Sequence, residues 1–150
     1  MRIVVQRVTT AEVSIAGIEK ARIPQGFLIL LGITADDDET DIDWLVQKIT
    51  GLRVFADPEG KMNLDIRQIR GEILVVSQFT LHASTRKGNR PSFLSAARPE
   101  QAVPLYARFL DTLGRMSGVP IASGVFGADM QIALVNDGPV TLIIDSKLRE

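Results

Sequence analysis

The stretch Phe27-Leu28-Ile29-Leu30-Leu31, followed by Gly32-Ile33, contains the longest apolar run of the chain and decides the fold class. A continuous apolar run of this length is typical of a strand buried on both faces. It is far too short for the ~20 residues that span a bilayer. Residues 73–79 predict a second buried strand. We therefore expect a domain built around buried strands.

Two helical stripes accompany these strands. Apolar residues recur at helical spacing at Ile42, Leu45, Val46, Ile49 and Leu52, and again at Ala102, Tyr106, Phe109, Leu110 and Leu113. Acidic residues between 36 and 43 precede the first stripe, where the helix dipole favours negative charge. Gly118 and Pro120 follow the second stripe and stop it. The sequence predicts one helix on each stripe.

Further strands complete the expected fold. β-Branched residues fill 2–8 and 11–16, and the corner at Thr9-Thr10 between them predicts a hairpin. Three short strands are expected near 121–126, 130–135 and 140–145. This order of strands, helix, strand, helix and strands predicts an α+β fold in a single domain, residues 1–150.

Composition excludes several classes of function. The net charge is −1, from 17 Lys and Arg against 18 Asp and Glu, which argues against a polybasic protein that coats nucleic acid but not against local contact. The chain has no cysteine and one histidine, His82, which excludes disulfides, thiol nucleophiles and thiolate metal sites. Phosphate-binding glycine motifs are missing too, so neither cofactor nor metal is expected. The first residues do not resemble a signal peptide, and we expect a cytoplasmic protein without a membrane partner.

Two segments could line a pocket. Ser77-Gln78-Phe79-Thr80-Leu81 ends the second buried strand, and polar side chains gathered at such a point often line a binding site. Alternatively, these side chains satisfy nearby backbone groups. In Gly124-Val125-Phe126-Gly127-Ala128-Asp129-Met130, the glycines either let a flat ligand approach Phe126 or Met130, or form a tight turn between core strands.

Two further segments are rich in turn residues. Asn136-Asp137-Gly138-Pro139 has strong turn chemistry, so local reasoning favours a hairpin turn with the usual trans proline bond. Residues 82–93 carry Arg86, Lys87 and Arg90 with little apolar content, which predicts a surface loop. These cations could hold phosphates or could simply be solvated.

Together these segments resemble the D-aminoacyl-tRNA deacylase family, also called D-tyrosyl-tRNA deacylases. The similarity covers the whole chain, from Met1-Arg2-Ile3-Val4-Val5-Gln6-Arg7-Val8 onward. Its most specific markers are Ser77 to Leu81 and Asn136-Asp137-Gly138-Pro139-Val140-Thr141, and Gly88-Asn89-Arg90-Pro91-Ser92-Phe93 and Gly124 to Met130 add to them. Several separated motifs in one order are far more specific than any single motif.

The resemblance implies a homodimeric enzyme that hydrolyses the ester between a D-amino acid and the 3′ end of tRNA. It implies two packed, barrel-like β-sheets with helices on one side. Gly138-Pro139 would be a cis dipeptide that enters the partner's pocket, binds the substrate amino group and excludes an L side chain. Glycyl-tRNA, which has no side chain to exclude, is then an expected substrate. We expect Thr80 and Gln78 to act in catalysis, Ser77, Phe79, Phe126 and Met130 to bind substrate, and Arg86, Lys87 and Arg90 to contact tRNA.

Two mechanisms remain open. Thr80 could be a nucleophile, but its hydroxyl needs a base, and His82 is the candidate because alternate residues of an extended strand share a face. Alternatively, the 2′-hydroxyl of the terminal ribose activates water, while backbone N–H groups around Phe79 and Thr80 bind the oxyanion. A pocket poor in acid–base groups favours the second mechanism. Two other functions remain open. The protein could be a non-catalytic module that binds the tRNA end, or it could be a hydrolase that removes other mischarged amino acids from tRNA.

Overall fold

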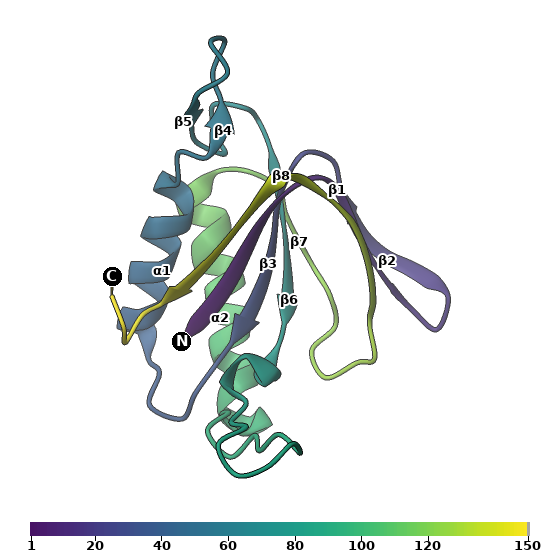
Figure 1. Cartoon of the computed structure of the whole chain (residues 1–150), viewed down its shortest axis with the longest axis vertical. Coiled ribbons are helices and arrows are strands. Elements are labelled where there is room, and N and C mark those ends of the chain that lie inside the picture. The colour runs from purple at the N-terminus through teal and green to yellow at the C-terminus, as the bar shows by residue number, and fades with distance from the viewer. Residues whose placement is uncertain (150) are drawn as a thin grey trace.

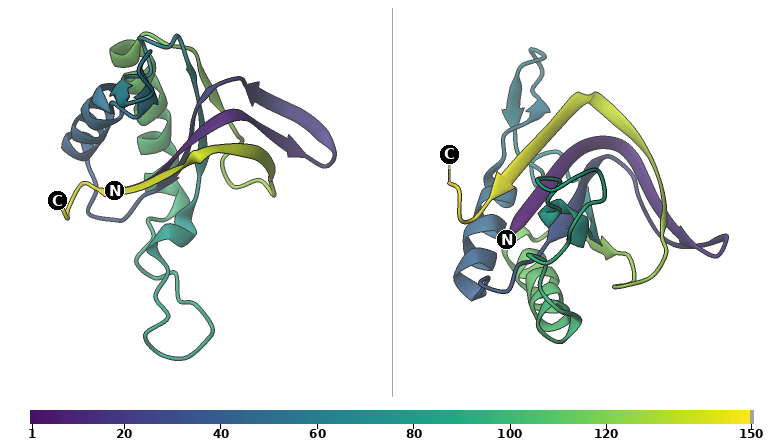
Figure 2. Two further views of the ribbon diagram at one scale, coloured as in Figure 1. Left: turned by 45° about the horizontal axis from the view of Figure 1, so that its top comes forward. Right: turned by 60° about the horizontal axis from the view of Figure 1, so that its bottom comes forward.

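Two long, bent strands organise the sheet of this computed structural model, which describes residues 1–149. β1 (Arg2–Ile15) pairs with β8 (Gln131–Asp145) along one edge, and with β3 (Gly26–Gly32) and then β2 (Ile18–Ile23) along the other. β6 (Glu72–Ser77) lies parallel to β3, and β7 (Ile121–Ser123) lies parallel to β6. Because β1 and β8 bend, β2 comes to lie against β6 and β7, and the sheet nearly closes into a barrel (Figures 1 and 2).

The two helices cover one face of this sheet. α1 (Glu39–Gly51) and α2 (Pro99–Ser117) pack on it through a buried cluster that includes Phe27, Leu45 and Phe109. A second buried cluster, which includes Val13 and Leu74, fills the interior of the barrel. The expected α+β class, with a barrel-like sheet and helices on one side, is therefore confirmed.

The start of α1 and both ends of α2 lie where local chemistry predicts. The Asp38 carboxylate accepts the Thr40 N–H at 2.8 Å, and the Asp41 carboxylate accepts the Asp38 N–H at 2.9 Å, which together form a capping box. α2 starts at Pro99 and ends before Gly118, which adopts φ +67°. Neither helix within residues 1–149 has the length and apolar composition needed to cross a membrane.

Two of the predicted turns are wrong. The chain does not reverse at Thr9-Thr10: β1 runs through this corner with shifts of register, and the turn comes later, at Ala16-Gly17. β-Branched residues keep the backbone extended, so the strand bends instead of reversing. Asn136-Asp137-Gly138-Pro139 does not form a hairpin turn either, because β8 continues through it and joins the two strands expected near 130–135 and 140–145.

Smaller elements project from opposite ends of the barrel. At one end, β4 (Phe55–Ala56) and β5 (Met62–Leu64) form a two-stranded hairpin. At the other end, β6 is followed by a short 3₁₀ helix, η1 (Phe79–His82), and by an extended loop over residues 83–98. Figure 1 shows the hairpin at the top of the molecule and the loop at the bottom.

Candidate active site

A cavity of about 260 Å³ opens where β3 and β6 end. Its walls come from the ends of these strands, from the segment between β7 and β8, and from the start of α2. The lining residues are Leu31, Ile33, Val76, Ser77, Gln78, Phe79, Ala97, Ala102, Phe126, Gly127, Ala128, Met130 and Ile132. The fold thus brings together residues from the segments Ser77 to Leu81 and Gly124 to Met130. The pocket interpretation of these two segments therefore agrees with the structure.

The polar side of the cavity is formed where the chain leaves β6. Gln78 donates its backbone N–H to the Leu31 carbonyl at 2.7 Å, and its side-chain amide donates to Thr80 Oγ1 at 2.5 Å. Thr80 itself lies beside the cavity and is not among its lining residues. The first N–H groups of η1, on Phe79 and Thr80, have no acceptor within residues 1–149. Two free N–H donors therefore lie next to the polar side of the cavity.

His82 is not placed to act as a base for Thr80. Residues 79–82 form a 3₁₀ helix instead of an extended strand, so residues two apart no longer share a face. The imidazole lies against Gly32, where an added Cβ would be 2.9 Å from the His82 Cδ2 atom. Its buried Nε2 has no hydrogen-bond partner among the residues described. Burial lowers the pKa of His82, so the ring is neutral at neutral pH.

We expect this histidine to make the protein less stable in mild acid. Unfolded chains take up the His82 proton near the ordinary pKa of about 6.5, whereas the folded chain takes it up only at lower pH. Acid then favours the unfolded state, so the free energy of unfolding should fall from about pH 7 to about pH 5. Denaturant titrations at several pH values should show a steeper fall for the wild type than for His82→Gln. Parallel curves would contradict this expectation.

The second wall of the cavity is fixed by close packing. The Gly124 N–H donates to the Val75 carbonyl at 3.1 Å, and a Cβ at Gly124 would collide with Sδ of Met130. Phe126 packs edge-on against Tyr106, with ring centroids 5.7 Å apart. The buried Tyr106 hydroxyl donates to the same Val75 carbonyl at 2.9 Å, and burial raises its pKa to about 12. These contacts hold Phe126 and Met130 in the wall.

Gly138 and Pro139 lie in a bulge of β8. The pairing of β1 with β8 passes from Gln6–Thr141 to Val8–Asn136, so residues 137–140 bulge out opposite one residue of β1. The bond between Gly138 and Pro139 is cis, contrary to the trans bond that local reasoning favours. Gly138 has φ +121°, a backbone conformation that residues with a side chain rarely adopt.

Arg7 holds this bulge from the facing strand. Its Nε donates to the Asp137 carbonyl at 3.0 Å and lies 3.2 Å from the Asp137 carboxylate, while Nη1 donates to the carbonyl of Val54. A Cβ added to Gly138 would lie 2.8 Å from Arg7 Nη2. Arg7 thus holds the peptide between Asp137 and Gly138, and its side chain would have to move to admit a side chain at Gly138.

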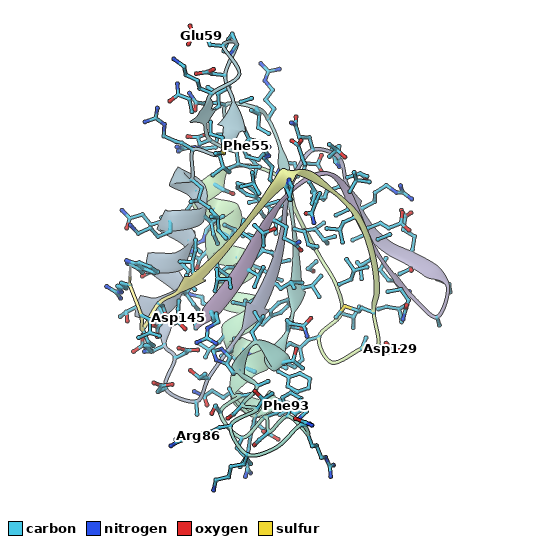
Figure 3. All side chains as sticks on the ribbon, in the orientation of Figure 1. Phe55, Glu59, Arg86, Phe93, Asp129 and Asp145 are labelled. Atoms are coloured by element: carbon cyan, nitrogen blue, oxygen red, sulfur yellow. The ribbon has the colours of Figure 1, made fainter. Side chains whose placement is uncertain are left out.

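The bulge and the cavity lie at opposite ends of the barrel. Val54, which Arg7 contacts, precedes Phe55, and Figure 3 shows Phe55 in the upper part of the molecule. Phe93 lies in the lower part, and its ring centroid is 5.1 Å from that of Phe79 at the cavity. The cavity lining found within residues 1–149 includes neither Gly138 nor Pro139.

The cationic loop projects from the same end as the cavity. An antiparallel bridge between Ser84 and Ser92, with N–H···O distances of 2.8 and 2.9 Å, closes its base. Arg86, Lys87 and Arg90 lie in the enclosed segment and are exposed to solvent. The predicted surface loop is therefore present, and it lies next to the cavity.

Sequence reasoning missed Arg7 and the small residues of the cavity wall. Arg7 is a cation within a β-branched strand, and only 11% of its side chain is exposed. A buried cation inside a strand needs a specific hydrogen-bond or charge partner. Arg7 could therefore have been singled out from its position among β-branched residues. The sequence could not assign Ala97 and Ala102 to the cavity wall, because small apolar residues occur in pocket walls and in protein cores alike.

Comparisons with known proteins identify the family. A family model described as D-Tyr-tRNA(Tyr) deacylase matches residues 4–145. A protein named D-aminoacyl-tRNA deacylase from Cytophaga hutchinsonii is 58% identical over 147 residues, which cover 98% of each chain. A protein of the same name from Porphyromonas gingivalis is 59% identical over 150 residues, which cover 100% of each chain. A solved structure named c-Myc DNA Unwinding Element Binding Protein superposes with a TM-score of 0.90 at 42% identity, over 97% of this chain and 98% of that one. The chain belongs to the D-Tyr-tRNA(Tyr) deacylase family.

Proposed function

We propose that the protein hydrolyses the ester between a D-amino acid and the 3′ end of tRNA, and releases the free amino acid and tRNA. The observation that carries this proposal is the cavity lined jointly by Ser77-Gln78-Phe79 and by Phe126 to Met130, in a member of a deacylase family. A mostly apolar cavity with a few polar groups on one side suits an aminoacyl ester. Because this substrate is charged tRNA, we place the enzyme in the cytoplasm.

The chemistry in this cavity rests on positioning and on the substrate. Water adds to the ester carbonyl carbon, the bond to the 3′ oxygen breaks, and the proton from water reaches that oxygen by way of the neighbouring 2′-hydroxyl. The free N–H groups of Phe79 and Thr80 stabilise the oxyanion. Within residues 1–149, no basic side chain is hydrogen-bonded to the Thr80 hydroxyl, which instead accepts from the Gln78 amide. This arrangement supports a substrate-assisted reaction over attack by Thr80.

Chiral selection comes from Gly138-Pro139 of a second copy. The separation of the bulge from its own cavity supports this assignment, because the motif can then reach only the cavity of a partner. Its backbone carbonyls bind the substrate ammonium group, and its rigid wall excludes an L side chain. Glycine passes this filter, so glycyl-tRNA is hydrolysed as well.

The free edge of β8 supports a homodimer that would place the motif in this way. Among the described residues, β8 pairs only with β1, so its outer edge has unpaired backbone groups. Val135 and Ile143 of this strand are exposed apolar side chains, and exposed Leu148 follows it. Apolar side chains along an unpaired edge favour association with another copy.

The direct test is incubation of the purified protein with D-Tyr-tRNA, L-Tyr-tRNA and Gly-tRNA. We expect release of D-Tyr and Gly while L-Tyr-tRNA stays intact. Release of both tyrosine enantiomers would overturn the chiral filter. Binding of charged tRNA without any release would instead identify a non-catalytic module.

The cations of the loop should govern the salt dependence of tRNA binding. Each phosphate contact contributes about −0.7 to −0.9 to the slope of log K against log salt, so the triple variant Arg86→Gln, Lys87→Gln and Arg90→Gln should flatten this slope by about two. Lys20→Gln with Lys61→Gln, at exposed positions on other elements, is the control and should change the slope little. An unchanged slope in the triple variant would show that the loop does not contact tRNA phosphates.

A further inference from the structure

We propose that Phe93 and Leu94 form a second base-binding site, which takes the nucleotide that precedes the 3′-terminal adenosine of the substrate. This inference rests on the proposed function, since it assumes that the terminal nucleotide occupies the mouth of the cavity. It adds a contact to the single-stranded end of the RNA, distinct from the phosphate contacts of the loop.

The first observation is an apolar surface that the fold does not need. Leu94 is 96% exposed, Phe79 is 55% exposed and Phe93 is 39% exposed. None of the three belongs to either buried cluster. Phe93 packs edge-on against Phe79, with an interplanar angle of 76°, so the two rings present differently oriented faces beside the cavity. Exposed aromatic rings next to a binding site are typical of surfaces that stack on bases.

The second observation is the charge around this surface. The segment 73–99 contains no Asp or Glu, but it carries Arg86, Lys87, Arg90 and Arg98, and all four cations are exposed. In a chain with a net charge of −1, this segment beside the cavity therefore carries only positive charge. Aromatic rings combined with a cationic track are the usual means of binding single-stranded nucleic acid.

The third observation is the order of these features in space. The Ser84–Ser92 bridge ends immediately before Phe93 and so fixes the ring between the cavity and the cationic segment. Figure 3 shows Phe93 and Arg86 in the same lobe, below the barrel. The Phe79 and Phe93 ring centroids are 5.1 Å apart, a distance between one and two stacking steps of about 3.4 Å. A nucleotide next to one that contacts Phe79 at the cavity is therefore close enough to contact Phe93.

The test compares two substrates of different length. One is the D-alanyl ester of adenosine, and the other is the same ester on an RNA minihelix with a single-stranded CCA end. Phe93→Leu should lower kcat/KM for the minihelix by about tenfold, the size of effect typical of one lost base–aromatic stack. It should leave kcat/KM for the adenosine ester within about twofold, because that substrate has no second base to stack.

Two controls separate base stacking from local packing. Phe93→Trp keeps an aromatic face and should retain activity on the minihelix. Ile18→Ala removes an exposed apolar side chain at the start of β2 and should alter neither substrate. An equal loss on both substrates with Phe93→Leu would mean that Phe93 only supports Phe79, and no loss on either would mean that it binds no base. Both results would overturn the proposal.

Failure of the proposed function would be distinguishable. If the wild type hydrolyses neither ester, the deacylase proposal falls, and binding of a labelled single-stranded RNA ending in CCA then decides the base site. Weaker binding by Phe93→Leu than by the wild type would uphold the base site, and equal binding would overturn it.

Discussion

Replacing Gly138 by alanine should reduce hydrolysis of D-aminoacyl-tRNA by about 100-fold or more, while the protein still folds. Gly138 has φ +121°, and a Cβ there would lie 2.8 Å from Arg7 Nη2, so either the bulge or the Arg7 side chain that holds it must shift to accept a side chain. Under the proposed function this bulge forms one wall of the partner's active site. A displacement of about 1 Å in such a wall can cost about 100-fold in rate. Single-turnover deacylation of D-Tyr-tRNA, with circular dichroism as a check on folding, measures the effect.

Gly17→Ala is the matched control for this change. Gly17 also has a positive φ, +77°, but no heavy atom lies within 4 Å of a Cβ added there, and the residue is in the β1–β2 turn. The substitution also places a side chain at a positive φ, but at a position remote from the bulge. Its activity should therefore remain close to that of the wild type, and a comparable loss in both variants would point to strain alone.

Mixed dimers would show whether Gly138 acts across the subunit boundary. Ala128→Trp places a large side chain in the cavity wall and should block the cavity of its own subunit. A heterodimer of Gly138→Ala and Ala128→Trp subunits then has one open cavity, which receives the intact Gly138 of the blocked subunit. About half of the wild-type activity should return, although each homodimer is inactive. A heterodimer without activity would show that the motif serves its own subunit.

Removing the 2′-hydroxyl of the terminal adenosine should abolish hydrolysis, whereas Thr80→Val should slow it only about fivefold. Proton transfer by a positioned group typically contributes about 100- to 10,000-fold, and the substrate hydroxyl is proposed to supply it here. Thr80→Val removes a hydroxyl that accepts one hydrogen bond from Gln78, and a loss of about 1 kcal/mol corresponds to about fivefold in rate. Rates for the deoxy and ribo substrates with both enzymes measure the two effects.

The two substitutions also distinguish the mechanisms by their opposite outcomes. Thr80→Val that binds substrate but releases no amino acid would establish Thr80 as the nucleophile. Thr80→Ser keeps the hydroxyl and should match the wild type under either mechanism. The deoxy substrate should still compete with the normal one, because it keeps its contacts with the cavity. Loss of this competition would mean that the 2′-hydroxyl serves binding instead of catalysis.

The elements of the fold were predictable where the signal is local. The strands predicted at 27–33 and 73–79 are the buried strands β3 and β6, although β6 ends at Ser77. The errors at Thr9-Thr10 and at Asn136 to Pro139 have one cause. Thr9-Thr10 separates two β-branched runs and Asn136 to Pro139 contains residues that favour turns, but pairing between β1 and β8 keeps both segments within continuous strands. A local sequence pattern cannot predict strand pairing between residues that are more than 100 positions apart.

The candidate site was predictable to a similar degree. Ser77-Gln78-Phe79 and Gly124 to Met130 stand out because polar or glycine residues interrupt apolar strands, and these segments do line the cavity. Reasoning on alternate positions failed at His82, because the strand ends one residue after Val76 and a 3₁₀ helix replaces it. The contact of Arg7 with Asp137 joins residues far apart in sequence, so only the folded chain displays it.

The pairing of β1 with β8 also determines when the protein can fold. Arg2 lies opposite Asp145, and their side chains form an ion pair at 2.8 Å, so β1 can complete its pairing only after β8 has been synthesised. Contacts of such long sequence separation slow folding. Until residue 145 has left the ribosome, one edge of β1 remains open to unwanted pairing with other chains. Nascent chains that stop short of β8 should therefore aggregate, and the barrel can be completed only after that strand is released.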